Sequence, residues 1–500
     1  MAEVFRLVTL RARENGSDAA YIRAADGRDL TWRALAHYAA GLRRQARERR
    51  LPPRARVGIV AADPLAFAAV YLGVLAAGLT AVPVDPRLTA AESGDTAGRL
   101  RLDVLVSDRP AELPRLPGVE LWDAAVEHPV VLRAGATGSP RPSDGAAARP
   151  AVLLTSSGTT GRPKGIGLSE WQLLHAARRV ARHHRFGPGE RGYNPLPLFH
   201  VNAQVMGLLA TLVGGGSLVL DRRFEPDAYW DRVARWSPTW LNTVPAVLAA
   251  LATRPAPPEG VAARIRFARS ASAPLPAATQ RAFTDATGVR VLETYGMTEA
   301  AGQITANPLD PAARREGSVG VPVGVGLAVL GPGGRLAGPG ELGMVALRGR
   351  QVAARYLDAG DDGTERDRPA RDKAGWLPTG DLGTRDEDGF VYLSGRADDV
   401  INRGGEKIFP QEVESVLLAH PAVRSAAVVA APHDRLGQVP VALVTVDPGH
   451  DGGLVEALHA LCARRLARYK RPAGIEIAAA LPTGPTGKVL RRRVREELAR

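Results

Sequence analysis

A segment rich in small and hydroxylated residues, Leu-Thr-Ser-Ser-Gly-Thr-Thr-Gly-Arg-Pro-Lys-Gly at positions 154–165, has the composition of a phosphate-binding loop. Glycine has no Cβ, so the backbone turns tightly and brings its N–H groups close to a ligand. Hydroxyl donors and cationic side chains add contacts that suit a polyphosphate. The residues expected to bind are Thr155, Ser156, Ser157, Gly158, Thr159, Thr160, Gly161 and Lys164. The loop lacks the Gly-Lys-Ser/Thr ending of a Walker loop, and a solvated linker is the alternative interpretation.

The sequence on each side of this loop predicts the elements that would position it. Apolar residues 151–154 predict a buried strand before the loop, and residues 169–181 have the spacing of a helix after it. Upstream, residues 56–61, 65–78 and 80–84 alternate strand, helix and strand, which predicts a parallel sheet covered by helices. Ligands bind such sheets at the carboxyl ends of strands, so the loop lies where a binding site is expected.

A second group of chemically suited residues follows the strand-like residues 289–292. Tyr295 offers a planar ring that suits a nucleotide base, and Gly296 gives the chain room to turn. Thr298 offers a hydroxyl to a phosphate oxygen, and Glu299 offers a carboxylate to a hard cation such as Mg²⁺. By themselves these residues indicate a nucleotide site only weakly.

Three other positions have both a functional and a structural interpretation. Asp381 follows Gly380 and could accept both hydroxyls of a ribose, although an Asx turn explains it equally well. His200 ends an apolar segment, where a histidine more often serves packing, but its position soon after the phosphate loop could place it at the site as a catalytic residue. Residues 269–275 are mostly small, which leaves room either for a ligand or for close chain packing.

Composition limits the class of protein. The chain has 500 residues, 45% of them hydrophobic, one cysteine (Cys462) and a formal net charge of +13. This length predicts at least two domains, and the single cysteine favours a reducing compartment, the cytoplasm. The most apolar region, residues 57–84, is interrupted by charged, proline and glycine residues, so we expect no membrane span. Arginines are spread beside acids, which argues against nucleic acid as a partner.

The chain is expected to divide near a polar segment at 395–399. Before it, the patterns predict a large α/β domain, residues 1–394, made of parallel-sheet layers and a small β-barrel-like element around residues 317–347. After it, residues 400–500 predict a small α+β domain. Near its end, Lys488 lies just beyond a glycine-containing loop and would be a movable positive charge.

Taken in order, these segments resemble the adenylate-forming superfamily of acyl-CoA synthetases, peptide-synthetase adenylation domains and luciferase-type enzymes. The resemblance covers nearly the whole chain. Residues 155–165 are similar to the family's phosphate loop, and residues 295–299 to its Tyr-Gly-x-Thr-Glu motif. Residues 376–381, 395–414 and 482–488 resemble its ribose, hinge and terminal-lysine motifs.

The resemblance implies a two-step reaction. A substrate carboxylate would attack the α-phosphorus of ATP, releasing pyrophosphate and leaving an acyl-adenylate. It implies that Lys488 bridges the carboxylate and the α-phosphate, that Thr298 holds that phosphate and that Glu299 carries Mg²⁺. Asp381 and Arg396 would fix the ribose.

In the second step the C-terminal domain would rotate about a hinge at Asp398. This rotation would withdraw Lys488 and bring Gly404, Gly405 and Glu406 beside a channel for a thiol. Residues 404–414 and 469–472 are most similar to free-standing acyl-CoA synthetases, which favours coenzyme A as the acceptor. A carrier-protein thiol, an amine or a small nucleophile such as nitrite is the alternative.

Within that group, residues 197–201, 269–274 and 307–309 are similar to ligases of oxalate and of short- or medium-chain acids. The segment His200-Val201-Asn202-Ala203 departs from the His-x-His-Gly of the oxalate type, and Gly302-Gln303 replace larger polar residues. Aromatic, acrylic and fatty acids therefore remain possible substrates, and the sequence does not determine the oligomeric state. The residues expected to line the acyl pocket, beside His200, are Val201, Ser270, Ala271, Ser272, Ala273 and Ala300.

Overall fold

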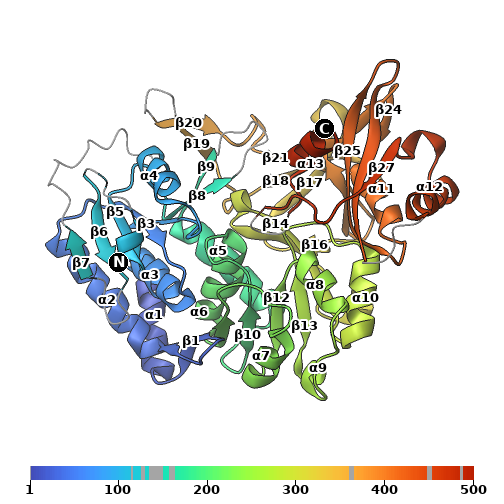
Figure 1. Cartoon of the computed structure of the whole chain (residues 1–500). Coiled ribbons are helices and arrows are strands. Elements are labelled where there is room, and N and C mark those ends of the chain that lie inside the picture. Colours follow the sequence, from blue (N-terminus) through green and yellow to red (C-terminus); the bar gives the residue numbers. More distant parts are fainter. Residues whose placement is uncertain are drawn as a thin grey trace.

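The computed structural model describes residues 2–113, 116, 118–124, 130–133, 150–156, 164–359, 365–447, 453–484 and 488–499. Within these residues, the chain up to position 396 forms two nine-stranded sheets and one four-stranded sheet, and residues from 401 onward form a five-stranded sheet. Figure 1 shows this last part, coloured orange to red, as a separate lobe at one end of the larger body. No helix in the described part of the chain is both long and apolar enough to cross a bilayer.

The first nine-stranded sheet contains the predicted strand–helix–strand alternation. β3 (Arg56–Val60), α3 (Pro64–Ala76) and β4 (Thr80–Pro83) confirm it, and β3 and β4 pair in parallel. Helix α3 begins at Pro64 because the Asp63 carboxylate accepts hydrogen bonds from the first free N–H groups of the helix. In spatial order the sheet is β20 (Glu365–Pro369), β19 (Arg355–Ala359), β9 (Lys164–Leu168), β8 (Val152–Ser156), β4, β3, β5 (Val104–Ser107), β6 (Glu120–Asp123) and β7 (Val130–Arg133).

The second nine-stranded sheet is parallel from β14 to β1, and antiparallel at its two edges. It therefore brings the carboxyl ends of several strands to one edge, where α/β sheets bind ligands. In spatial order it is β16 (Val321–Pro322), β15 (Gly302–Ala306), β14 (Val291–Met297), β13 (Phe267–Ser270), β12 (Trp240–Thr243), β10 (Arg191–Asn194), β11 (Ser217–Leu220), β1 (Ala19–Arg23) and β2 (Asp29–Thr31).

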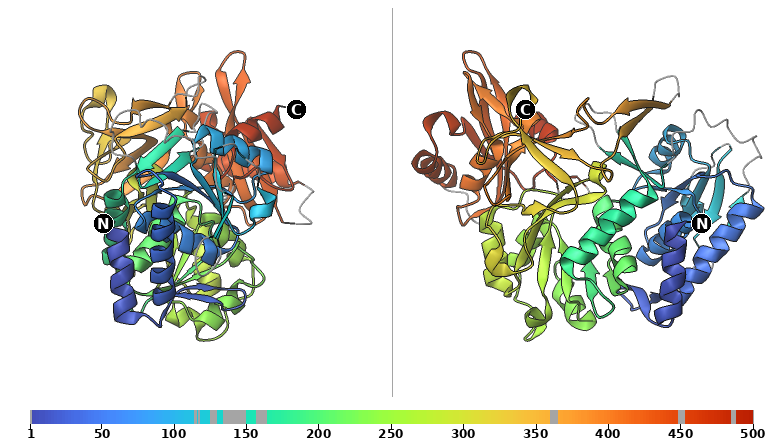
Figure 2. Two further views of the ribbon diagram at one scale, coloured as in Figure 1. Left: turned by 90° about the vertical axis from the view of Figure 1, so that its left-hand side faces the viewer. Right: turned by 180° about the vertical axis from the view of Figure 1, so that it is seen from behind.

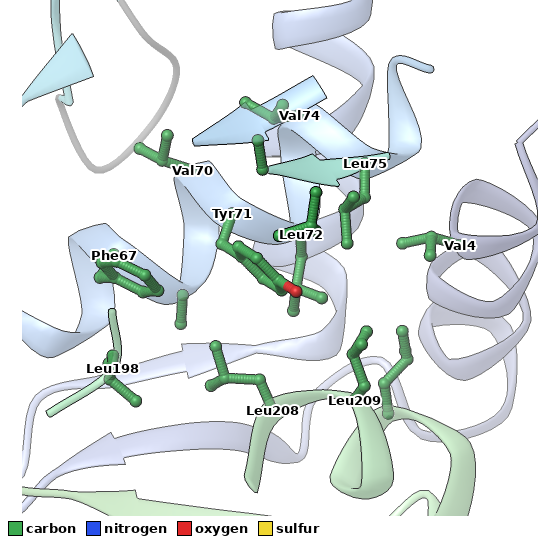
Figure 3. Close-up of a cluster of buried hydrophobic side chains, with 14 of the residues drawn as sticks. Val4, Phe67, Val70, Tyr71, Leu72, Val74, Leu75, Leu198, Leu208 and Leu209 are labelled. Carbon is green, nitrogen blue, oxygen red and sulfur yellow. The ribbon is translucent and has the colours of Figure 1, made fainter. Parts of the chain in front are cut away.

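Helices cover both sheets and fill the space between them. The largest core joins strands of both sheets to helices that lie between them, as Figure 3 shows for Phe67, Tyr71 and Leu72 of α3 opposite Leu198 and Leu208. Separate hydrophobic clusters cover the outer faces, so the larger body has alternating helix and sheet layers (Figure 2). The helices are α1 (Glu3–Asn15), α2 (Trp32–Glu48), α4 (Ala90–Arg99), α5 (Glu170–His184), α6 (Ala210–Gly214), α7 (Tyr229–Trp236), α8 (Pro245–Ala252), α9 (Val261–Arg264), α10 (Ala277–Thr287) and the π-helix η2 (Asn202–Leu209).

The predicted barrel-like element is an antiparallel four-stranded sheet. It consists of β17 (Gly326–Leu330), β18 (Gly343–Arg348), β21 (Leu377–Arg385) and β22 (Val391–Arg396). Its core also contacts Tyr295 and Met297 at the end of β14, so this sheet closes over that edge of the second large sheet. Short 3₁₀ turns connect the larger body: η1 (Pro110–Glu112), η3 (Thr298–Ala300), η4 (Pro311–Ala313), η5 (Pro332–Gly334) and η6 (Ala397–Asp399).

The C-terminal part has hydrophobic clusters of its own, one on each face of its sheet. Its strands and helices form the α+β arrangement that was expected after residue 400. Arg491 of α13 pairs with Asp399 at 3.3 Å and with Glu414 at 2.6 Å, which ties the helix to the start of this part. The elements are β23 (Ile401–Arg403), β24 (Glu406–Ile408), α11 (Pro410–Leu417), β25 (Val423–His433), β26 (Gly437–Val446), α12 (Leu454–Arg465), η7 (Arg468–Lys470), β27 (Gly474–Ile477) and α13 (Arg491–Leu498).

Candidate active site

The Ser/Thr/Gly loop connects two adjacent antiparallel strands. β8 ends at Ser156 and β9 begins at Lys164, and their paired residues include Thr155 with Gly165. The loop residues Ser157, Gly158, Thr159, Thr160 and Gly161 lie outside the described part of the chain. Helix α5 follows as predicted, with a capping box between Ser169 and Gln172, but β9 in front of it was not predicted.

Gly165 serves strand packing. A Cβ at this position would lie 2.8 Å from the backbone oxygen of Leu357 on β19, so glycine allows β9 and β19 to approach each other. The approach matters for the site, because β19 carries Tyr356 and β9 carries Lys164, whose Nζ lies 5.4 Å from the centre of the Tyr356 ring.

Three residues of the predicted nucleotide motifs meet where β14, β21 and β22 come together. The Tyr295 hydroxyl donates to Asp381 Oδ2 at 2.5 Å, and Arg396 Nη1 donates to Asp381 Oδ1 at 3.2 Å. Gly380 has φ of +80°, and a Cβ there would lie 2.5 Å from the Arg396 guanidinium. The glycine is therefore required for both the backbone turn and the position of Arg396. Burial, together with Asp381, raises the pKa of Tyr295, so its hydroxyl keeps its proton.

Glu299 lies next to this group, in η3. Tyr356 donates to its Oε1 at 3.2 Å. Burial raises the pKa of Glu299, and the positive charges of Arg396 and Lys164 act in the opposite direction. Tyr356 was not predicted from the sequence, because no motif or periodicity singled it out.

The surroundings of Glu299 fit a metal ion that is shared with phosphate groups. A carboxylate oxygen is a suitable Mg²⁺ ligand, and Lys164 and Arg396 supply the positive charge that a polyphosphate needs. The part of the chain that the structure describes contains no group of three or more His, Cys, Asp or Glu side chains that could hold a metal by themselves. Glu299 therefore suits an ion whose other ligands come from a nucleotide and water. Thr298, half-buried, begins the same 3₁₀ turn.

The residues expected to line the acyl pocket lie on the same side of the molecule, at the start of η2 and after β13. Asn202 Nδ2 donates to Ser272 Oγ at 3.1 Å, and Arg269 Nη1 donates to Asn202 Oδ1 at 2.7 Å. Ser272 has φ of +75°, which is uncommon for a residue with a side chain and is typical of functional sites. An eight-residue π-helix such as η2 is also rare and often marks a functional site.

Several buried polar atoms in these segments have no hydrogen-bond partner within the described residues. Buried polar groups are normally paired, so their concentration here points to a ligand or water. The atoms are His200 Nε2, Gln204 Oε1, Arg269 Nε, Ser270 Oγ and both amide atoms of Gln303. Burial lowers the pKa of His200 to about 4, so its imidazole is neutral at physiological pH.

The other residues expected in the acyl pocket differ in their environment. Val201 and Ala273 are half-buried, and Ala271 is buried at the end of β13. Ala300 is fully buried in the hydrophobic core of the four-stranded sheet.

The C-terminal residues named from the sequence are exposed. Asp398 lies in η6, and Gly404, Gly405 and Glu406 lie at the turn between β23 and β24. The carbonyl oxygen of Lys488 accepts a hydrogen bond from Gly484 N at 2.8 Å, and the neighbouring Val489 forms an antiparallel bridge with Thr483. Within the described residues, no hydrogen bond or ion pair joins the Lys488 ammonium to Thr298 or Glu299.

Comparison with known proteins gives the family. The sequence matches the AMP-binding enzyme family over residues 8–357 and the AMP-binding enzyme C-terminal domain over residues 412–488. The sulfoacetate–CoA ligase of Cupriavidus necator is 39% identical, over 97% of this chain and 96% of its own length. The oxalate–CoA ligase of Arabidopsis thaliana is 32% identical, over 87% of each chain.

The fold comparison agrees. A crystal structure of an anthranilate CoA ligase in complex with anthranoyl-AMP matches with a TM-score of 0.84 and 25% identity, over 99% of this chain and 97% of that chain. The predicted fold class and the resemblance to adenylate-forming enzymes are both confirmed. The chain therefore belongs to the AMP-binding enzyme family, and it is an AMP-forming ligase that uses ATP, with Mg²⁺, to join a carboxylic acid to coenzyme A.

Proposed function

We propose that the Tyr295–Asp381–Arg396 group binds the nucleotide ribose, and that acid activation takes place beside it. The observation that carries this proposal is the pair of hydrogen bonds to Asp381, at 2.5 and 3.2 Å. These bonds orient the carboxylate and leave it further lone pairs for the ribose hydroxyls. Tyr295 was expected from the sequence to stack on the base. Its hydrogen bond to Asp381 adds a positioning role to that expectation.

In the first step, a carboxylate oxygen of the acid bonds to the α-phosphorus while the bond to the bridging oxygen of pyrophosphate breaks. The protein contributes mainly by positioning the reactants and by placing positive charge where negative charge develops. We assign Thr298 to the α-phosphate, Glu299 to Mg²⁺ and Lys488 to the developing charge between carboxylate and phosphate. Residues 155–161 with Lys164 would hold the departing pyrophosphate.

In the second step, the thiol of coenzyme A displaces AMP from the acyl group. We propose that residues 400–500 rotate about Asp398, within the segment 395–399, relative to a core of residues 1–394. The separate hydrophobic cores of the C-terminal part support this division, because a lobe with its own core can move as a unit. Rotation would replace Lys488 at the site by the turn that contains Gly404, Gly405 and Glu406.

For the acid, we propose a short and polar substrate. The two relatives described above are named for sulfoacetate and oxalate, both short acids with a second acidic group. The unpaired buried atoms of His200 and Ser270 support a polar substrate, because an aromatic or fatty chain would leave them unsatisfied. His200, neutral at physiological pH, would make a hydrogen bond to the bound acid.

Replacing the terminal lysine tests the division into two steps. Lys488→Ala is expected to reduce acid-dependent pyrophosphate release by about 10²–10³-fold, because a charge that stabilises the transition state is lost. Thioester formation from supplied acyl-adenylate and coenzyme A should stay within a few-fold of wild type. Lys373→Ala, at another exposed lysine, is the matched control. An equal loss of both steps in Lys488→Ala would contradict the assigned role.

The acceptor and the compartment can be tested separately. Acyl transfer to an added carrier protein, measured by its mass in the absence of coenzyme A, would show a second acceptor beside coenzyme A. We propose the cytoplasm as the site of the reaction, because a chain with the single cysteine Cys462 forms no disulfide of its own, as is usual in a reducing compartment. Fractionation of cells that produce the protein would test this location.

A further inference from the structure

Arg269 is a buried arginine at the carboxyl end of a central parallel strand. It lies on β13, opposite Asn242 of β12 and Leu292 of β14, and only 3% of its surface is exposed. Burying a cation is costly unless an opposite charge or a full set of hydrogen bonds compensates for it. The partners of this guanidinium therefore decide what it can do.

The hydrogen bonds of Arg269 leave its charge uncompensated. Nη1 donates to Asn202 Oδ1 at 2.7 Å and to Asn242 Oδ1 at 3.1 Å, and both acceptors are neutral amides. Its Nε is buried and has no partner within the described residues, and no carboxylate there raises the pKa of its guanidinium. Burial lowers the pKa of Arg269 to about 9, which still leaves the guanidinium charged at neutral pH.

Other inward-facing arginines of this chain are compensated. Arg232 pairs with Asp221 at 2.8 Å, and Arg491 pairs with Glu414 at 2.6 Å. Within the described residues Arg314 forms no ion pair, but its Nε, Nη1 and Nη2 donate to the backbone carbonyls of Pro308, Val291 and Leu309, respectively. Among these residues Arg269 has neither an acid nor a full set of acceptors.

The amides around Arg269 are held in one orientation. Asn242 Nδ2 donates to Asn194 Oδ1 at 2.7 Å, and Asn194 Nδ2 donates to the carbonyl of Leu196 at 2.9 Å. Both Asn242 and Asn202 therefore turn their oxygens toward the guanidinium. Asn202 continues the network to the exposed Ser272, so hydrogen bonds link the buried cation to the protein surface within the segments assigned to the acyl pocket.

We propose that Arg269 binds a second anionic group of the acid, at the end opposite to the carboxylate that becomes adenylated. This inference deepens the proposed function and rests on it. The substrates would be short acids that carry a further carboxylate or sulfonate. Asn202 and Asn242 are positioning residues that hold Nη1, while Nε and the rest of the planar fork meet the anion.

Substrate preference of the wild-type enzyme is the first test. Pyrophosphate release would be measured with ATP, coenzyme A and five acids: oxalate, malonate and sulfoacetate, which carry two acidic groups, and acetate and propionate, which carry one. We expect kcat/KM to be at least about 10²-fold higher for the best acid with two acidic groups, because monoacids leave the buried cation unpaired. Comparing malonate with sulfoacetate separates carboxylate from sulfonate recognition.

Arg269→Met is the second test, with Arg314→Met as the control at another inward-facing arginine. Arg269→Met should lower kcat/KM for the acids with two acidic groups by about 10²–10³-fold and change acetate and propionate by less than about fivefold. Arg269→Lys should keep part of the preference, and Arg314→Met should keep all of it. Thermal unfolding and ATP binding of each variant check that the fold and the nucleotide site are intact.

The outcomes separate this inference from the proposed function. Similar rates with propionate and malonate in the wild-type enzyme, or an equal loss for every acid in a folded Arg269→Met variant, would overturn the anion subsite and leave acid activation standing. If Arg269→Met does not fold, the wild-type preference alone decides. Failure of the wild-type enzyme to release pyrophosphate with any of the acids, despite ATP binding, would contradict the proposed short acid substrate, and the subsite with it.

Discussion

Two groups of residues each contain an inward-facing arginine. The nucleotide group, which is proposed to bind the ribose, consists of Tyr295, Asp381 and Arg396. The acyl-pocket group, which is proposed to bind the acid, includes Arg269 and Asn202, and the positive charges of the two arginines are compensated differently. Arg396 donates to Asp381, which also accepts a hydrogen bond from Tyr295. Arg269 donates to two neutral amides and keeps a buried Nε without a partner in the described residues. The charge of Arg396 is thus balanced by Asp381, whereas the charge of Arg269 is not balanced by a carboxylate within the described residues.

This difference indicates how the two groups can recognise their ligands. A ribose is neutral, so a carboxylate already paired with Arg396 binds its hydroxyls without leaving a net buried charge. A buried cation without an acid partner favours an anion and disfavours a neutral chain. In the proposed function, residues whose charges are compensated bind the nucleotide, and a buried arginine whose charge is not compensated selects the acid.

The largest expected effect on activity comes from removing the charge of Asp381, which pairs with Arg396. Asp381→Asn should lower kcat/KM for ATP by about 10²–10³-fold, because Arg396 loses its charged partner and the ribose loses an acceptor. Preference among acids should stay the same, since Arg269 is untouched. Pyrophosphate release over a range of ATP concentrations measures the effect. Asp388→Asn, which removes an exposed partner of Arg315, is the control, and a changed acid preference in Asp381→Asn would show that the two groups are not independent.

An intermediate effect is expected from acid pH, which acts on the stability of the fold through the largely buried imidazole of His200 in the acyl pocket. The pKa of His200 is about 4 in the folded protein, where burial and Arg87 lower it and Asp85 raises it, against about 6.5 when unfolded. Between these values the unfolded chain binds more protons, so stability falls as pH falls from 6.5 to 4, by up to about 3 kcal/mol. Above pH 6.5 this histidine contributes nothing to the pH dependence.

His200→Gln should therefore make the free energy of unfolding less sensitive to acid. Urea unfolding at pH 7 and pH 4.5 measures the change, and His37→Gln, at an exposed histidine on α2, is the control. His183 and His184, whose pKa values are also lowered by burial, are kept in both variants and cancel in the comparison. The same acid sensitivity in His200→Gln and wild type would mean that His200 is solvated.

The smallest expected effect comes from removing the hydrogen bond between Tyr356 and Glu299, beside the residues proposed to bind the nucleotide. Tyr356→Phe removes the hydroxyl that donates to Glu299 but keeps the ring that contacts Lys164, so KM for ATP with Mg²⁺ should rise about five- to tenfold. The effect of Mg²⁺ concentration on the initial rate measures it. Tyr392→Phe, which removes a hydroxyl bonded to Asp386, is the matched control. An unchanged KM would show that Glu299 is oriented without Tyr356.

Several elements and site residues could be predicted from the sequence because their signals are local. Helix α3 follows an Asp-Pro start, and α5 follows a Ser-x-x-Gln capping box. Tyr295, Asp381 and Arg396 were named from their motifs. Their hydrogen bonds could not be predicted, since Tyr295 and Asp381 are 86 positions apart and meet only where the four-stranded sheet packs on β14. Tyr356 and strand β9 gave no usable signal.

The sequence alone determined the layered α/β architecture, the α+β class of the C-terminal part and the family of the reaction. These depend on periodicity, capping and motif order, which are properties of neighbouring residues. The tertiary structure decided that Asp381 is shared by Tyr295 and Arg396, and that Arg269 is surrounded by amides. Charge compensation depends on side chains brought together from distant strands, and local sequence carries no record of those neighbours.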